Sequence, residues 1–159
     1  MTTEVLRLGL PKGRMEANVL RLLADAGIRV EPSARSYRPA ISLDGVEAKT
    51  LKPQNIVEML DLARRDLGFA GADWVEELDA KVVQVLDTRL DPVRIVAAAP
   101  LELLESGRLP ARRLVVSSEY ERLARRWIKE RSLDAEFAPS GVMRIGRLQA
   151  QEGFAYIKP

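Results

Sequence analysis

The chain has 159 residues, of which 47% are hydrophobic and 30% are charged, so it can bury a core as one domain or two small lobes. It contains no cysteine and no histidine, which excludes disulfide scaffolds, Cys or His metal sites, cysteine nucleophiles and Ser-His-Asp triads. A net charge of +2, from 25 basic and 23 acidic side chains, gives little support to nucleic-acid binding.

Predicted strands and helices alternate along the chain, which favours α/β layers around a largely parallel sheet. In the first part of the chain, we predict a strand at 5–10, a helix from 15 to 26, a hairpin of strands at 40–44 and 46–51, a helix at 53–64, a strand at 67–70, a helical turn at 74–78 and a strand at 82–86. In the second part, we predict a strand at 93–99, a helical turn at 100–104, a strand at 113–117, an amphipathic helix at 118–131, and strands at 135–138 and 154–157.

A change in charge indicates two lobes, 1–92 and 93–159. Residues 1–92 carry 13 basic and 15 acidic side chains, whereas residues 93–159 carry 12 basic and 8 acidic ones. No apolar stretch approaches the ~18 residues of a membrane span, and the amino terminus lacks the apolar core of a secretory signal. We therefore expect a cytoplasmic protein without membrane association.

The first candidate site is the loop Pro11-Lys12-Gly13-Arg14 between the first strand and helix. Such a loop presents free backbone N–H groups, and the helix dipole favours an anion there. Gly13 permits close approach of the backbone to a ligand, and Lys12 and Arg14 suit phosphate. A solvated turn with two surface cations is an equally good interpretation of this loop.

Two further loops carry candidate residues. Arg35, Tyr37 and Arg38 lie in the segment SARSYRP, where they could clamp a phosphate or stack on a base, although an ordinary surface loop is favoured. Gly71 and Asp73 follow a predicted strand, and ligands of open α/β sheets bind beyond the carboxyl ends of strands. Asp73 could hold a ribose hydroxyl, or a metal through water, but an ordinary helix N-cap explains it equally well.

The remaining charged clusters favour structural explanations. Asp87, Asp91 and Arg94 could face a cleft, but a surface ion pair is the preferred interpretation. The cations of helix 118–131 fit a solvated face with i,i+4 partners such as Glu121–Arg125, because exposed aromatic side chains do not alternate with them. These cations are Arg122, Arg125, Arg126, Lys129 and Arg131.

Taken in order, several segments resemble the catalytic subunit of ATP phosphoribosyltransferase, the first enzyme of histidine biosynthesis. They are LRLGLPKGRM, SARSYRP, LKPQNIVEML followed by DLGFAGADWVEEL, LDTRLDPVRIVAAAP, and SSEYERLARRWIKERSLDAEF. The resemblance covers about residues 5–138. It implies two α/β lobes hinged like the type II periplasmic binding proteins, with the site in the cleft between them. It also implies transfer of phosphoribosyl from phosphoribosyl pyrophosphate (PRPP) to N1 of the adenine of ATP, with Mg²⁺ accompanying the pyrophosphate.

The resemblance further implies residue roles and partners. Ribosyl transfer through an oxocarbenium-like state needs cation clamps and positioning more than a histidine base, which suits this chain. The implied partners are ATP, PRPP, further copies of the chain and a regulatory subunit similar to histidyl-tRNA synthetase. The implied site consists of Lys12 and Arg14 as catalytic groups at phosphate, Gly13 and Arg35 at ligand phosphate, Gly71 and Asp73 on the nucleotide side, and Arg94 in the cleft near the hinge.

The chain departs from the family pattern after Ala138. Arg144 stands where a glutamate is expected, and Phe154 and Lys158 take two acidic places of the next strand. The family's Thr-Gly-x-Thr-Leu loop, which cradles the 5′-phosphate of PRPP with bonds of ~1.5–3 kcal/mol each, does not occur before Pro159. We therefore expect a two-lobed fold truncated at its carboxyl end. The alternative function is a catalytically impaired module that binds nucleotides or anions on the same scaffold.

Overall fold

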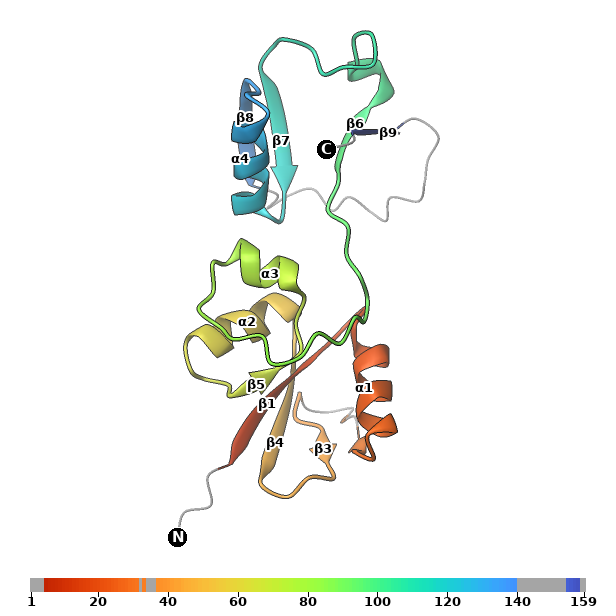
Figure 1. Ribbon diagram of the computed structural model, residues 1–159, viewed down its shortest axis with the longest axis vertical. Coiled ribbons are helices and arrows are strands. Elements are labelled where there is room, and N and C mark those ends of the chain that lie inside the picture. Colours follow the sequence, from red (N-terminus) through yellow and green to blue (C-terminus); the bar gives the residue numbers. More distant parts are fainter. Residues whose placement is uncertain (1–4, 32, 34–36, 140–153, 158–159) are drawn as a thin grey trace. The chain divides into compact units, whose positions relative to one another are not determined.

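The computed structural model describes residues 5–31, 33, 37–139 and 154–157, and the chain divides into two compact units, Met1–Val93 and Arg94–Pro159 (Figure 1). Each unit contains helices and a pair or more of parallel strands, which confirms the predicted α/β class. Among the described residues, no helix has the length and apolar character needed to span a membrane.

The first unit is built on three parallel strands in the order β4-β1-β5. β1 (Leu6–Pro11) lies in the centre, between β4 (Val46–Leu51) and β5 (Leu67–Gly68). Because the three strands run in the same direction, the loops that leave their carboxyl ends lie along one edge of the sheet. This edge carries the candidate site.

One face of the sheet is covered by α1 (Glu16–Asp25). Val19 and Leu23 of this helix form a buried cluster with alternate residues of β1, Leu8 and Leu10, and with Ala48 of β4. The predicted helix ends as expected, since Gly27 has a φ of +79°, a left-handed conformation that favours glycine at the end of a helix.

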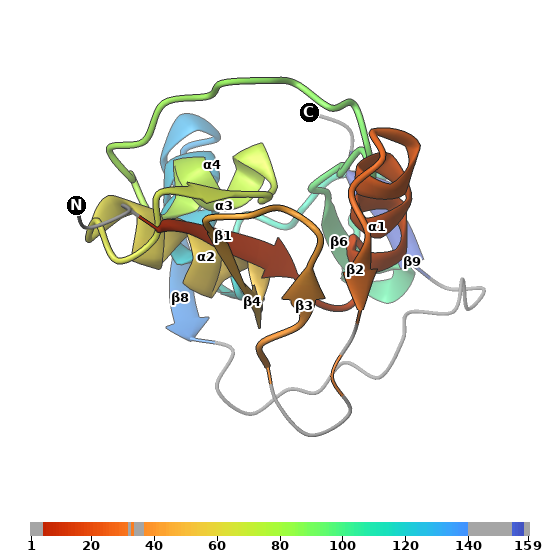
Figure 2. The same cartoon turned by 90° about the horizontal axis from the view of Figure 1, so that it is seen from below.

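The opposite face is covered by α2 (Pro53–Asp61), against which α3 (Ala72–Glu77) packs (Figure 2). Ile56 of α2 is fully buried and lies directly over two glycines of the sheet. A Cβ atom would stand 3.1 Å from Ile56 Cγ2 at Gly9 and 2.5 Å from it at Gly68. The absence of side chains at both positions therefore lets the helix approach the strands closely.

The predicted hairpin of strands 40–44 and 46–51 is wrong. β3 (Ala40–Ile41) pairs antiparallel with β2 (Val30–Glu31), whereas β4 pairs parallel with β1. The Asp44-Gly45 turn exists, with Gly45 at a φ of +73°, but its Gly45 carbonyl accepts the Leu6 N–H at 2.8 Å. The turn thus directs β4 onto the central strand, where its alternate side chains reach the buried cluster.

The predicted strand at 82–86 is also wrong. These residues pair with no strand in the described part of the chain, and Val83 and Val85 are 87% and 80% exposed. The segment 82–86 is mostly apolar and rich in valine, as strands often are, but a strand forms only where a neighbour offers backbone hydrogen bonds. The connection instead begins with the Lys81 N–H donating to the Asp61 carboxylate at 2.7 Å.

The second unit contains a parallel β-α-β arrangement. β7 (Leu114–Ser118) pairs with β8 (Ala135–Pro139), and α4 (Glu121–Glu130) connects them. The predicted Glu121–Arg125 pair is confirmed, with Arg125 Nε 2.8 Å from Glu121 Oε1. The Arg125 guanidinium also lies 4.9 Å from the centre of the Phe137 ring. Among the cations of the predicted helix 118–131, Arg125 therefore supports the fold of its own unit.

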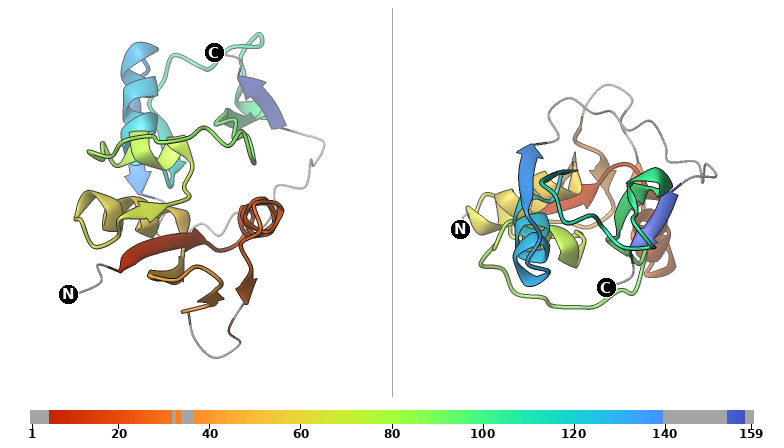
Figure 3. Two further views of the ribbon diagram at one scale, coloured as in Figure 1. Left: turned by 60° about the horizontal axis from the view of Figure 1, so that its bottom comes forward. Right: turned by 90° about the horizontal axis from the view of Figure 1, so that it is seen from above.

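A second pair of strands completes this unit. β6 (Ala97–Pro100) begins four residues later than the predicted strand and leads into a short 3-10 helix, η1 (Leu101–Leu103), close to the predicted turn. β6 pairs antiparallel with β9 (Phe154–Ile157), and the two strands run side by side in both views of Figure 3.

Candidate functional site

The strand order of the first unit creates a topological switch point between β1 and β5. The chain leaves β1 into α1 on one face of the sheet, and it leaves β5 into α3, which packs with α2 on the opposite face (Figure 1). In open α/β sheets, ligands bind at the carboxyl edge where neighbouring connections diverge in this way. The two loops at this point are Lys12-Gly13-Arg14 and Phe69–Asp73.

The strand register places these two loops level with each other. Gly9 of β1 is the partner of Gly68 of β5, and the Phe69 N–H donates to the Gly9 carbonyl at 3.2 Å. Lys12 follows Gly9 by three residues, and Gly71 follows Gly68 by three residues. The first and third candidate motifs therefore share one edge of one sheet, although 59 residues separate them in the chain.

The loop after β1 is fixed at both ends by backbone bonds. The Lys12 N–H donates to the carbonyl of Leu51 at the end of β4, at 2.9 Å, and Gly13 adopts a φ of +84°. The Gly13 N–H donates to Glu16 Oε2 at 3.3 Å, while the Glu16 N–H donates to the Gly13 carbonyl at 3.1 Å. Glu16 thus puts a carboxylate at the backbone N–H of the loop, and the exposed Arg14 extends from the same turn.

Tyr37, from the second candidate segment, joins this loop. Its ring centre lies 5.1 Å from the Lys12 ammonium nitrogen. Its backbone carbonyl accepts the Thr50 N–H of β4 at 2.8 Å, so the segment is attached near the carboxyl end of that strand. The structure therefore brings a residue of SARSYRP and a residue of the first loop into direct contact.

Gly71 and Asp73 form the other side of the switch point. Gly71 is the extended residue before α3, and Asp73 lies in the first turn of that helix, half-buried. A Cβ atom at Gly71 would collide with the Asp73 carboxylate, which folds back over the loop. Glycine at position 71 therefore makes room for the carboxylate at the carboxyl edge of the sheet.

Further candidate residues are Arg35, Arg38, Asp91 and Arg94. Arg35 lies outside the described residues. Arg38 is 3.5 Å from Glu47 Oε1 in an exposed ion pair, and Arg94 is an exposed residue at the start of the second unit. Asp91 accepts a hydrogen bond from the Asn18 side chain of α1 at 2.9 Å.

Two residues at the site were missed in the sequence. Lys52 is the exposed residue between β4 and α2, adjacent to the Leu51 carbonyl that binds the first loop. Its position directly before Pro53, a typical first residue of a helix, was the available signal. Glu16 stands three residues after Gly13, the spacing at which an acidic side chain returns to a backbone N–H at a helix start.

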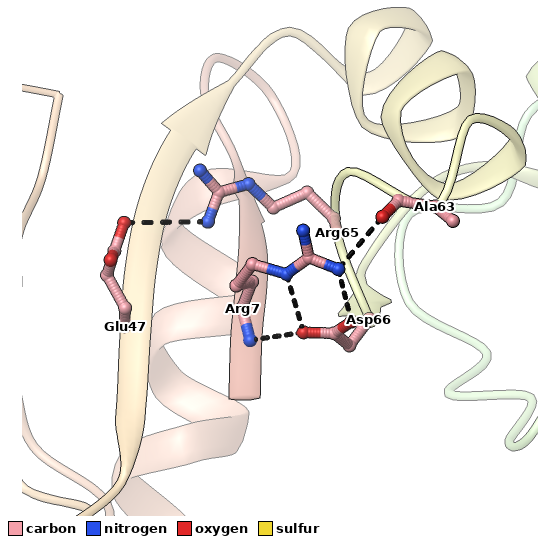
Figure 4. A network of polar contacts seen from close by, with 5 residues as sticks. All are labelled: Arg7, Glu47, Ala63, Arg65 and Asp66. Carbon is pink, nitrogen blue, oxygen red and sulfur yellow. Dashed lines mark hydrogen bonds and ion pairs between the residues drawn. The ribbon is translucent and has the colours of Figure 1, made fainter. Parts of the chain in front are cut away.

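A network of hydrogen bonds and ion pairs lies at the amino end of the strands of the first unit, away from the candidate site (Figure 4). Arg7 holds the Asp66 carboxylate through Nε at 3.0 Å, Nη2 at 2.7 Å and its backbone N–H at 2.7 Å. These hydrogen bonds lower the pKa of Asp66 from its ordinary 3.8 to about 2. Nearby, the buried Arg65 guanidinium lies 3.8 Å from Glu47 Oε1. This network ties the starts of the strands together.

Comparisons with known proteins identify one family. The family described as "HisG: ATP phosphoribosyltransferase" matches residues 52–141. The ATP phosphoribosyltransferase of Chlorobium phaeobacteroides is 40% identical over 101 residues, which are 60% of this chain and 34% of that protein. That of Trichlorobacter lovleyi is 30% identical over 134 residues, 81% of this chain and 46% of that protein. The chain thus spans between a third and a half of the length of these relatives.

A solved structure supports the fold. The "ATP phosphoribosyl transferase (HisG:HisZ) complex from Thermotoga maritima" contains a chain that superimposes with a TM-score of 0.69, covering 96% of this chain and 73% of that one. The sequence identity is 20%, so this likeness concerns the architecture alone.

Proposed function

Because the chain belongs to the ATP phosphoribosyltransferase family, we propose that it serves the first step of histidine biosynthesis, the transfer of phosphoribosyl from PRPP to ATP. The observation that carries the proposal is the meeting of Lys12-Gly13-Arg14 and Gly71–Asp73 at the switch point. Cations on one loop and a carboxylate on the other suit a ligand that has both phosphates and a ribose.

In the proposed reaction, N1 of the adenine forms a bond to C1′ of the ribosyl group while the bond from C1′ to pyrophosphate breaks. Pyrophosphate leaves with the electron pair, so negative charge grows on its oxygen in the transition state. Lys12 and Arg14 would stabilise that charge, and the Gly13 backbone would approach the phosphates closely. Asp73 would accept a hydrogen bond from a ribose hydroxyl, and we propose phosphate contacts for Arg35 and a contact near the hinge for Arg94.

The proposal includes Mg²⁺ as a companion of the phosphates. Mg²⁺ in phosphoryl and pyrophosphoryl sites is held by one or two carboxylates together with substrate phosphates. Within residues 5–31, 33, 37–139 and 154–157, no group of three or more acidic side chains gathers as a resident metal site. We therefore propose that the ion enters with PRPP and neutralises phosphate charge, with Asp73 as the carboxylate that would accompany it.

We further propose the finer architecture and the partners that the family implies. The two units would correspond to lobes hinged like type II periplasmic binding proteins, with boundaries near residues 92 and 93. The similar Thermotoga protein is titled a HisG:HisZ complex, which supports a regulatory partner of that kind, alongside self-association. ATP and PRPP are intracellular metabolites, so the proposed location is the cytoplasm.

Binding of pyrophosphate tests the site separately from turnover. We expect Lys12→Ala/Arg14→Ala to weaken binding of Mg-pyrophosphate by about 100-fold or more, since it removes two charge-assisted contacts of ~1.5–3 kcal/mol each. Arg21→Ala/Arg64→Ala is the matched control, because it removes the same charge from two exposed positions outside the loops, one in α1 and one just after α2. Calorimetric titration of folded variants is the measurement. Equal affinities in the two double variants would refute the proposed site.

Release of pyrophosphate from ATP plus PRPP tests the activity itself. Release by the wild-type chain, lost in Lys12→Ala/Arg14→Ala, supports the transferase. Binding of ATP without release of pyrophosphate would instead assign the chain to a nucleotide-binding module on the same scaffold.

A further inference from the structure

Among the residues that the structure describes, the partner of Lys12 is an aromatic ring and not a carboxylate. Its ammonium nitrogen lies 5.1 Å from the centre of the Tyr37 ring, within the ~6 Å range of a cation–π interaction. A carboxylate partner would neutralise the ammonium and occupy its N–H groups. A ring face attracts the ammonium but leaves its charge and most of its donors available. This choice of partner suits a lysine that must receive an anion.

The backbone brings the two residues together from separate strands. The Lys12 N–H donates to the Leu51 carbonyl at 2.9 Å, and the Thr50 N–H donates to the Tyr37 carbonyl at 2.8 Å. Thr50 and Leu51 are the last two residues of β4, so one strand end fixes both partners. Main-chain bonds to one strand end therefore bring the backbones of both residues together, and the Tyr37 side chain then reaches the Lys12 ammonium.

Tyr37 contributes little to the core, since the residue is 66% exposed. Its contact with Lys12 nevertheless gives this exposed ring a candidate function at the site. A free lysine side chain loses up to ~2 kcal/mol of conformational entropy when a ligand orders it. A ring that restricts the stem beforehand reduces this loss.

We propose that Tyr37 is a positioning residue, whose ring holds the Lys12 ammonium at the switch point ready for the phosphate groups of the ligand. The inference rests on the proposed function, since it concerns how that site is organised. It assigns Tyr37 an action through Lys12 and no direct contact with the ligand.

A double-mutant cycle on Mg-pyrophosphate binding tests this role. We expect Tyr37→Leu to weaken binding about two- to five-fold, the range of an exposed cation–π interaction. Tyr37→Phe should bind as tightly as the wild-type chain, because it keeps the ring. Lys12→Met should weaken binding about ten-fold or more. In the Lys12→Met background, Tyr37→Leu should not weaken binding of Mg-pyrophosphate further, because the ammonium group that the ring positions is gone. Circular dichroism and thermal melting would verify that each variant is folded.

The outcomes separate the inference from the proposed function. Unchanged affinity in Lys12→Met would overturn the proposed phosphate site. If Lys12→Met weakens binding but Tyr37→Leu does not, the positioning role alone is wrong. An equal loss from Tyr37→Leu in both backgrounds, or a loss in Tyr37→Phe equal to that in Tyr37→Leu, would also overturn it, because either result means direct contact with the ligand.

Discussion

The close packing of α2 on the sheet predicts that a single methyl group at Gly68 destabilises the first unit. A Cβ atom there would stand 2.5 Å from Ile56 Cγ2, 3.4 Å from Leu60 Cδ1 and 3.5 Å from the Gly9 carbonyl oxygen. Ordinary carbon–carbon contacts are about 3.5–4.0 Å, so Ile56 would have to move by about 1 Å. Ile56 is 0% exposed, so a shift of its side chain must displace the residues packed around it.

Two opposing terms set the magnitude for Gly68→Ala. Overpacking of a buried site costs about 1–3 kcal/mol. Replacing glycine also restricts the unfolded chain, which stabilises by about 0.4–1 kcal/mol where the backbone is compatible, and Gly68 does not require a positive φ. The steric term wins, and we expect a net loss of about 1–2 kcal/mol. Gly9→Ala, whose Cβ would stand at 3.1 Å, should cost less.

Urea unfolding followed by Trp74 fluorescence measures this loss in the first unit, in a Trp127→Phe background that leaves Trp74 as the only tryptophan. The decisive comparison repeats Gly68→Ala in an Ile56→Ala background, where the obstructing atom is gone. There the substitution should be neutral or stabilising, because only the unfolded-state term remains. An equal destabilisation in both backgrounds would show that Ile56 is not the cause.

Two further predictions concern charged groups. The folded pKa of Asp66, about 2, lies below its ordinary 3.8, so its bonds to Arg7 stabilise the fold fully above about pH 4 and less and less as the pH falls toward 2. Asp66→Asn should therefore flatten the curve of unfolding free energy against pH between about pH 4 and 2. An unchanged slope in that range would contradict the lowered pKa. Glu16→Gln removes a negative charge beside the Gly13 N–H and should tighten Mg-pyrophosphate binding about two- to five-fold, a modest surface electrostatic effect. The exposed Glu58→Gln is the control, and equal affinities for the two variants would contradict a role of Glu16 at the site.

Elements with a strong internal pattern could be predicted from the sequence. The helices around Ile56 and Glu121, and the strands at β1, β7 and β8, lie within a few residues of their predicted places. Their signals are local, since a helix needs only its own periodicity and an apolar run needs only burial. Pairing partners are not local. The valine-rich run at 82–86 predicted a strand and the Asp44-Gly45 turn predicted a hairpin. The first segment pairs with no described strand, and the strand after the turn pairs with β1.

The same division holds for the candidate site. The residue types of Lys12-Gly13-Arg14 and Gly71–Asp73 could be singled out because each loop follows a predicted strand. Their common edge could not, because it depends on the order β4-β1-β5, which alternation does not encode. The contact between Lys12 and Tyr37 was equally hidden, since it arises from two main-chain bonds to the end of β4.

The packing that stabilises the first unit also controls the spacing of its candidate site. Gly9 and Gly68, the two glycines beneath Ile56, are paired across β1 and β5 and stand three residues before Lys12 and Gly71. Any side chain that pushes α2 away from these glycines therefore acts on the two strands that carry the loops. A cation clamp works only when its groups are held close to their required positions. Small residues at these two strand positions thus connect a buried contact to the geometry on which the proposed reaction depends.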